Sequence, residues 1–352
     1  MGRRKTIKLR YLVGAIKDKA SQGKAAILSR QNTLSLLRAT THDPHAPPNP
    51  KHLAAVLSLG RSSRVAASAA VEALMDRLQS TGDAYVALKC LVAAHHMANR
   101  GGFILQDQLS VFPTYGGRNY LNLSKFRDSS SHVTWQLSTW VRWYGEYVEN
   151  LLVASRVLGF FLGAEKLGGD FGEERVSAIL NAELIRETES LVGLLEQICK
   201  QPEILVASAN KLVDEIVRLV GDDCLSAINE ISARVTEFGE RLSCLSFVDS
   251  VELACALKRL EDCKERLQLL YFAKKDMNDG FWSVVGEIKE RVWMETEAKE
   301  GKLVVNIRKD KGTESARFGE RVVRPDDSVR FGSGRLAVSY CRFSNEPMES
   351  CA

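Results

Sequence analysis

The sequence contains no apolar run long enough to cross a membrane. The longest one, residues 151–163, falls short of the roughly 20 residues that a spanning helix needs, and Arg156 interrupts it. The basic N-terminus is not followed by the apolar core and small-residue cleavage site of a signal peptide. We therefore expect the protein to stay on the cytosolic side of any membrane that it meets.

The motifs of the common enzyme and metal-site classes are also missing. The eight cysteines form no CxxC pair, which argues against a zinc site or a disulfide framework and favours reduced thiols. Gly23-Lys24 lacks the upstream glycine and the following Ser or Thr of a phosphate-binding loop. No Ser/His/Asp or Cys/His grouping can be assembled either. These absences predict a binding protein without catalytic activity, cofactor or metal.

Strand-like alternation of apolar and polar residues is almost absent before residue 300. A helical pattern replaces it, and we expect a helix capped by Ser130 or Ser131, with Pro202 and Gly221-Asp222 marking breaks further on. Many consecutive helices predict an all-α fold, either a bundle or a superhelical solenoid of antiparallel helices. Besides the capped helix, helical spacing covers residues 64–78, 84–98, 174–200, 202–220, 222–247, 250–273 and 277–292.

Composition divides the chain into three parts. Residues 1–30 form a basic segment, residues 31–300 form the helical body, and residues 301–352 mix Gly, Ser, Arg and Asp. Short stretches of the last part, such as Leu303–Ile307, are candidates for strands. The segment is too short and polar to build a core, so we expect a flexible C-terminal tail that is mostly disordered.

Positive charge is concentrated at the N-terminal end. Residues 1–52 carry a net charge of about +9 whereas the whole chain carries +4, so the remainder is net acidic. Such polarity indicates an end that seeks an anionic surface, either nucleic acid or the anionic face of a membrane. Asp18 is the single acid of the first 30 residues. The expected auxiliary membrane contacts are Arg3, Arg4, Lys5, Lys8 and Arg10.

A cluster of anion-binding groups is predicted around the proline-rich loop of residues 42–51. Arg38 lies at the end of one expected helix, and Lys51 and His52 open the next. Arginine can bridge two phosphate oxygens, lysine adds a point charge, and a histidine at a helix N-terminus adds a donor beside free backbone amides. An inositol head group with two phosphates suits this mixed set, although an ordinary solvated helix end would show the same spacing.

The run Arg38-Ala-Thr-Thr-His42, followed by Lys51-His52-Leu53, resembles the phosphoinositide motif of the ANTH-domain clathrin assembly proteins. Three further matches follow in the right order, so that the resemblance covers about residues 30–160, and the motif-bearing part is residues 31–160. They are KCLVAAHH from Lys89, YLNLSKFRD from Tyr120 and WVRWYGEY from Trp140. This chain departs from the motif at two basic positions: Arg38 replaces the usual lysine, and Asn49 replaces the middle lysine. Its loop is also one residue longer than the loop of the motif.

The resemblance implies an ENTH/ANTH-like solenoid that binds phosphatidylinositol 4,5-bisphosphate on the cytosolic leaflet and acts in clathrin coat assembly and endocytosis. The implied locations are coated pits and vesicles, the plasma membrane and the Golgi. Clathrin as a partner follows from the resemblance alone, since no Asn-Pro-Phe, Asp-Pro-Phe or Asp-Leu-Leu motif occurs. SNARE helices are a further implied partner, and the short chain is similar to plant-type members.

Two alternatives stay open on the sequence. Asn49 and the longer loop fit a protein-binding solenoid, for SNAREs or cargo, whose lipid recognition is weakened. The basic arm also fits nucleic acid, because a phosphate backbone attracts the same residues. The aromatic segment of residues 135–147 lacks the interleaved basic residues of a base-stacking platform and is typical of a core between helices. We therefore expect no nucleic-acid partner.

Overall fold

The computed structural model describes residues 2–27, 31–44, 46–61, 63–112, 119–163, 171–203, 210–271 and 279–314. Within these ranges, side chains are described except at residues 2–11, 26–27, 31–32, 171–173, 279 and 300–314. The chain divides into two units, Met1–Gly301 and Lys302–Ala352, and the packing described below lies within the first.

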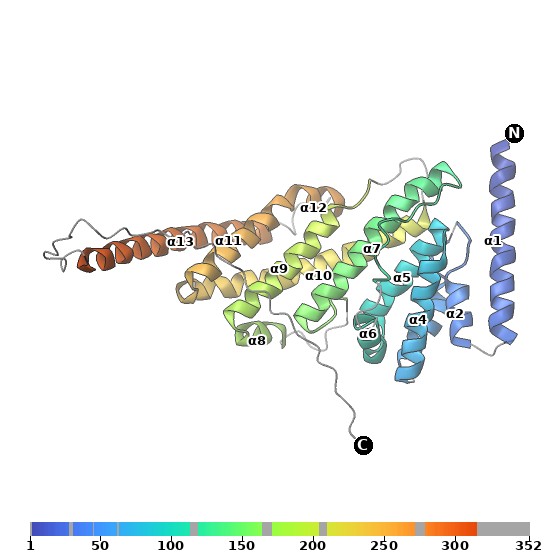
Figure 1. Cartoon of the computed structure of the whole chain (residues 1–352), viewed down its shortest axis with the longest axis horizontal. Coiled ribbons are helices and arrows are strands. Elements are labelled where there is room, and N and C mark those ends of the chain that lie inside the picture. Colours follow the sequence, from blue (N-terminus) through green and yellow to red (C-terminus); the bar gives the residue numbers. More distant parts are fainter. Residues whose placement is uncertain are drawn as a thin grey trace, which may run out of the picture. The chain divides into compact units, whose positions relative to one another are not determined.

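Every regular element of the described residues is a helix, which confirms the predicted all-α fold (Figure 1). Two short 3₁₀ turns, η1 (Leu59–Arg61) and η2 (Leu242–Cys244), join the longer helices. The α-helices are α1 (Gly2–Ile27), α2 (Gln31–Ala39), α3 (Pro50–Ser58), α4 (Arg64–Ser80), α5 (Ala84–Arg100), α6 (Phe103–Ser110), α7 (His132–Leu158), α8 (Phe171–Ala178), α9 (Asn181–Cys199), α10 (Lys211–Arg241), α11 (Phe247–Asp262), α12 (Lys264–Tyr271) and α13 (Asp279–Glu314).

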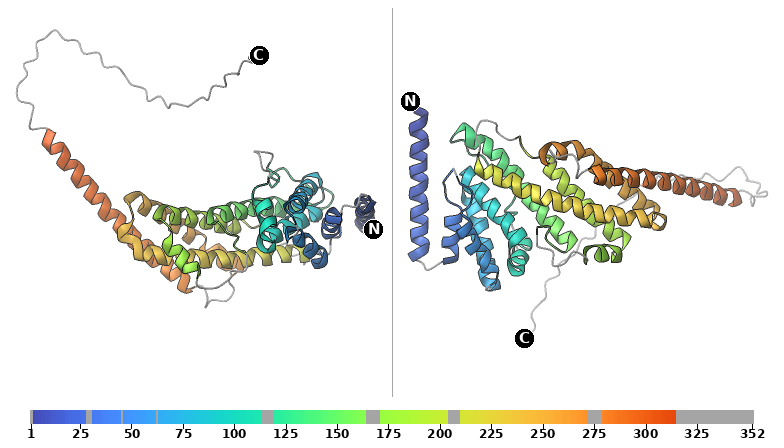
Figure 2. Two further views of the ribbon diagram at one scale, coloured as in Figure 1. Left: turned by 90° about the horizontal axis from the view of Figure 1, so that it is seen from below. Right: turned by 180° about the vertical axis from the view of Figure 1, so that it is seen from behind.

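Packing passes from each helix to the ones that follow it along the chain. α2 packs against α3 and α4, α4 against α5 and α6, and α5 against α7. α7 in turn packs against α9, and α9 against α10 and α11 (Figure 2). Because successive helices are neighbours in space, one hydrophobic core continues from α2 to α13. This is the arrangement of an α-solenoid.

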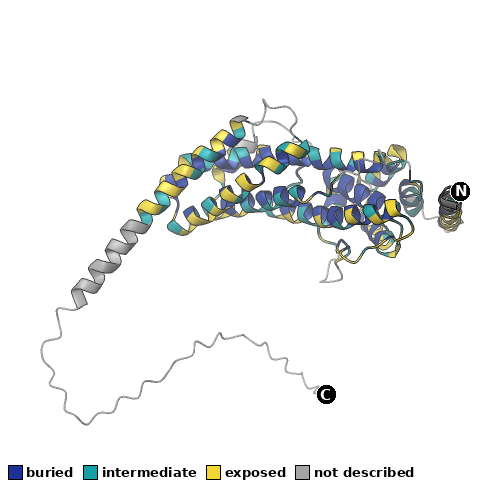
Figure 3. Ribbon diagram, turned by 90° about the horizontal axis from the view of Figure 1, so that it is seen from above, coloured by how far each residue is buried: buried dark blue, intermediate teal, exposed yellow. Residues whose placement is uncertain are grey.

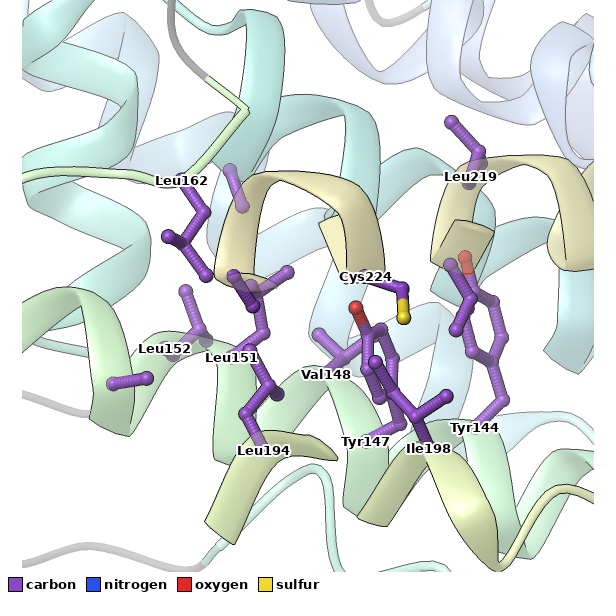
Figure 4. Close-up of a cluster of buried hydrophobic side chains, with 14 of the residues drawn as sticks. Tyr144, Tyr147, Val148, Leu151, Leu152, Leu162, Leu194, Ile198, Leu219 and Cys224 are labelled. Carbon is purple, nitrogen blue, oxygen red and sulfur yellow. The ribbon is translucent and has the colours of Figure 1, made fainter. Parts of the chain in front are cut away.

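The aromatic segment of α7 lies inside this core. Ser131 caps the helix in a capping box with Thr134, which confirms the predicted cap. Trp140, Tyr144 and Tyr147 are at most 1% exposed, and Figure 3 shows the buried residues of the helices in dark blue. Tyr144 and Tyr147 lie among buried residues of α7, α9 and α10 (Figure 4). Trp140, Tyr144 and Tyr147 therefore hold helices together, as the sequence indicated, whereas Trp135 at the start of the segment is 52% exposed.

Two details differ from the sequence-based expectations. The Gly221-Asp222 pair does not end a helix but lies within α10. A Cβ atom on Gly221 would lie 3.0 Å from the Tyr271 ring, so the glycine serves a close approach of α12. Leu303–Ile307 belongs to α13 and forms no strand, because the helix continues to Glu314. Residues 315–352 of the expected tail lie outside the described residues.

A buried charge cluster joins α9 to α10. The guanidinium of Arg234 is fully buried and donates to the carboxylate of Glu187 at 3.1 Å and to that of Glu230 at 2.7 Å. Burying a charge is costly unless partners satisfy it, and here two carboxylates surround one cation. The cluster therefore links the two helices through paired charges, and Arg175 of α8 adds a further contact to Glu187 at 3.4 Å.

Candidate functional site

The structure places the three predicted anion-binding residues on either side of the loop between α2 and α3. Arg38 lies in the last turn of α2 and Lys51 in the first turn of α3, and both side chains are exposed. The pKa of His52 lies below its ordinary value, first because the ring is partly buried and then because Arg38 and Lys51 repel the protonated form. Arg38 and Lys51 are therefore close enough for their charges to affect His52.

The start of α3 explains why asparagine occupies position 49. Asn49 is the N-cap of α3, and its side-chain oxygen accepts a hydrogen bond from the backbone N–H of Lys51 at 3.0 Å. Pro50 follows at the first helical position, where its missing N–H costs nothing. A lysine side chain has no acceptor and cannot provide this cap. The asparagine at this position of the motif therefore stabilises the helix that carries Lys51 and His52.

One half-buried cation, Arg77, and one buried cation, Lys89, hold the beginning of the loop in place. Arg77 of α4 donates from Nε to the Thr40 hydroxyl at 2.6 Å and from Nη2 to the Thr40 carbonyl oxygen at 2.5 Å. Lys89 of α5 is 1% exposed and donates to the carbonyl oxygen of Asp43 at 2.7 Å. Burial lowers the pKa of Lys89, and the negative charge of Asp43 opposes that shift. Lys89, the first residue of the second sequence motif, thus positions the loop through this buried hydrogen bond.

The single acid of the basic N-terminal segment also binds this loop. The carboxylate of Asp18 accepts hydrogen bonds from the backbone N–H of His42 at 2.8 Å and from its Nδ1 at 2.7 Å. Burial tends to raise the pKa of Asp18, but the bonds from His42 and the charges of His42 and Arg77 outweigh it and lower the pKa. A Cβ atom on Gly14 would lie 2.7 Å from the His42 Cβ, so α1 lies close against the loop.

The role of Asp18 is one that the sequence reasoning missed. Its signal was present, since an isolated acid among nine basic residues is unusual, but its partner lies 24 residues away. The same helix leaves apolar side chains in solvent: Leu12 is 56% exposed and Ile16 is 66% exposed. Exposed Lys17 and Lys19 follow them. This part of α1 combines apolar and cationic groups, as helices at membrane interfaces do.

The predicted auxiliary contacts Arg3, Arg4, Lys5, Lys8 and Arg10 all lie in α1, and their side chains are outside the described part. In the described residues, no three His, Cys, Asp or Glu side chains are grouped to hold a metal ion. A search of the same residues for a helix long and apolar enough to cross a membrane finds none.

Comparison with known proteins identifies what this chain resembles. The model of the ANTH domain family matches residues 32–272. An Arabidopsis thaliana protein that bears the name of a clathrin assembly protein is 50% identical over 342 residues, which cover 93% of each chain. A second Arabidopsis protein of that name is 35% identical over 312 residues, or 84% of this chain and 88% of its own length. A third is 30% identical over 300 residues, or 80% of this chain and 99% of its own length.

Proposed function

This chain belongs to the ANTH domain family of clathrin assembly proteins, and we propose that it binds phosphatidylinositol 4,5-bisphosphate through Arg38, Lys51 and His52. It then acts as a peripheral adaptor on the cytosolic face of a membrane during clathrin coat assembly and endocytosis. The observation that carries the proposal is the placement of exposed Arg38 in the last turn of α2 and of exposed Lys51, with His52 beside it, in the first turn of α3. A doubly phosphorylated head group is attracted to these cations, because its charges are opposite in sign.

The three residues offer different kinds of contact to the head group. The exposed guanidinium of Arg38 offers paired donors for two oxygens of one phosphate, and the ammonium of Lys51 offers a compact charge. The N-terminus of α3, with its partial positive charge, adds to the attraction for an anion beside His52. Lys89 and Asp18 form hydrogen bonds with the loop, and we assign them the role of positioning the loop rather than binding the ligand.

The first helix supplies a second, less specific attachment. Each Lys or Arg near an anionic bilayer contributes about 1 kcal/mol, so Arg3, Arg4, Lys5, Lys8 and Arg10 offset the missing middle lysine. The exposed apolar residues of α1 add a shallow insertion into the head-group region. The hydrogen bonds between Asp18 and His42 couple this helix to the head-group site.

The family membership supports a proposal for partners and location. We propose that the protein contributes to clathrin recruitment at coated pits and vesicles, at the plasma membrane or the Golgi, and that its solenoid accepts SNARE helices. The sequence carries none of the short motifs sought for coat proteins. A pull-down of clathrin with the full chain, in the presence and absence of membranes, therefore tests the clathrin partner separately from the lipid.

We expect the full chain to co-sediment with vesicles containing phosphatidylinositol 4,5-bisphosphate about tenfold better than with phosphatidylserine vesicles of equal charge. A tenfold difference in partitioning corresponds to a binding free energy of about 1.4 kcal/mol. This is about the contribution of one charge-assisted hydrogen bond, which only the doubly phosphorylated head group would form. Sedimentation at several protein concentrations gives both partition coefficients. Equal binding to both vesicles would leave only non-specific attraction, and no binding to either would favour a purely protein-binding solenoid.

Replacing Asn49 with lysine should strengthen membrane binding and weaken the fold at once. The new cation adds about 1 kcal/mol, or about fivefold, to vesicle partitioning. Loss of the cap lowers the free energy of unfolding by about 0.5–2 kcal/mol. Asn49→Ser, which keeps a capping oxygen and adds no charge, is the matched control and should change neither quantity. A lysine variant that binds vesicles no better than the control contradicts the assignment of this loop to the membrane.

A further inference from the structure

A second cluster of cations lies on the connection between α6 and α7. Arg127 donates from Nη1 to the carbonyl oxygen of Phe126 at 2.8 Å and to that of Ser124 at 3.3 Å. Arg142 of α7 donates from Nη1 to the same Phe126 oxygen at 3.0 Å. Two guanidinium groups therefore converge on one carbonyl oxygen, and the exposed Lys125 precedes them in the loop.

Among the described residues, the cations of this cluster have no carboxylate as an ion-pair partner. Across the described part of the chain, no Asp or Glu forms an ion pair within 4 Å of Lys125, Arg127 or Arg142. Asp128, next in sequence, is 3% exposed and accepts hydrogen bonds from the backbone N–H of Ala84 and of Ser130. Partial burial and the charge of Arg127 both lower the pKa of Arg142. An oxyanion between the two guanidinium groups would offset their repulsion and accept donors from both.

The cluster adjoins the same turn as the proposed phosphoinositide site. Gln79, near the end of α4, donates to the carbonyl oxygen of Tyr120, and the first residue of α5 is bonded to Asp128. The loop between α2 and α3 is held by Arg77 and Lys89 of these same two helices. Both cationic loops are therefore hydrogen-bonded to the same two helices, α4 and α5.

We infer that Arg127 and Arg142, with Lys125 beside them, form a second anion site that binds the phosphate of an anionic lipid in the same membrane. The inference rests on the proposed function for the membrane itself, but it uses a different loop and different residues. A phosphodiester or phosphomonoester group presents two oxygens to the paired guanidinium groups, and Lys125 contacts the head groups around it. The protein would then hold the membrane at two points.

The test uses the full chain with Arg127→Gln and Arg142→Gln, and vesicles of phosphatidylcholine and phosphatidylserine with and without phosphatidylinositol 4,5-bisphosphate. Each basic residue near such a surface contributes about fivefold to binding, so the pair should lose about 25-fold on both vesicles. Arg186→Gln with Lys258→Gln, which removes the same charge from exposed positions on α9 and α11, is the matched control and should lose much less.

Folding and ligand source are tested separately. Lys125→Glu changes an exposed side chain for which the structure gives no hydrogen bond, so it cannot act through the fold, and it should also weaken vesicle binding severalfold. If the wild-type protein binds vesicles and all of these variants bind equally well, the second site is refuted while the proposed function stands. If no vesicle is bound by any protein, the proposed function itself fails. Binding of inorganic phosphate or an acidic peptide at Arg127 and Arg142, with vesicle binding unchanged, would overturn the assignment to a lipid.

Discussion

Replacing Arg38 and Lys51 together with glutamate is expected to reduce binding to phosphatidylinositol 4,5-bisphosphate vesicles by a factor on the order of several hundred. The double charge reversal changes the site by four charge units, and each unit near an anionic surface is worth about fivefold. The two new carboxylates also repel the head group directly. Co-sedimentation over a range of vesicle concentrations measures the loss, which should shrink as salt screens the charges.

The fold should tolerate this double substitution. Both side chains are exposed, and neither takes part in the bonds that hold the loop. Glutamate at position 51 lies in the first turn of α3, where a negative charge is favourable, so it compensates for the less favourable glutamate at the end of α2. Arg186→Glu with Lys258→Glu gives an equal change of net charge elsewhere. If the two double variants bind vesicles equally, charge alone governs binding and the three-residue site is wrong.

The helix boundaries that flank the candidate site could be predicted from the sequence. Helical spacing placed Arg38 at a helix end and Lys51 at a helix start, and the structure has α2 ending at Ala39 and α3 beginning at Pro50. These are local features, because caps and prolines fix helix boundaries within a few residues. The positions of Arg77 and Lys89 beneath the loop were not predictable, because these contacts join residues 37 and 46 positions apart. Spacing within one segment carries no information about such pairs.

The two wrong predictions, a helix break at Gly221-Asp222 and a strand at Leu303–Ile307, also arose because context beyond the local sequence decides the structure. Glycine next to aspartate usually marks a turn, yet Gly221 lies inside α10 because Tyr271 of α12 needs the space that a side chain would fill. The short β-branched stretch at Leu303–Ile307 fits a strand locally, but the preceding helix continues through it. In both places the tertiary or helical context overrides a weak local preference.

The burial of His95 can be predicted from the sequence, but its hydrogen-bond partner cannot. Helical spacing over residues 84–98 places His95 on the same face as Leu88, Leu91 and Val92, which predicts a satisfied core histidine. The ring is fully buried, as this predicts. Its Nε2 lies 2.6 Å from the carboxylate of Asp223 and its Nδ1 lies 2.8 Å from the Tyr144 hydroxyl. The histidine and aspartate are 128 positions apart, so no pattern along the chain pairs them. This pair joins α5, at the motif-bearing end, to the middle of α10.

Replacing Asp223 with alanine is therefore expected to lower the free energy of unfolding by about 3–5 kcal/mol. The carboxylate is fully buried and accepts hydrogen bonds from Tyr147 and Asn99 as well as from His95, each at 2.6 Å. Its charge also contributes, after burial, to raising the pKa of Tyr147 well above the ordinary value. Removing the acceptor leaves the buried Tyr147 hydroxyl without this partner, and leaves His95 Nε2 and Asn99 Nδ2 with only their 3.1 Å contact to each other. Each unsatisfied buried group costs about 1–3 kcal/mol. Urea unfolding followed by circular dichroism measures the change.

Asp222→Ala is the control for this substitution, one residue earlier in the same helix. The Asp222 carboxylate is exposed and pairs with Arg218 one turn back at 2.8 Å. An exposed pair of this kind is worth about 0.5 kcal/mol, so alanine there should change the unfolding free energy little. The two variants have the same helix, composition and net charge and differ only in burial. A loss at Asp223 no larger than the loss at Asp222 would mean that the buried network does not hold α5 and α10 together.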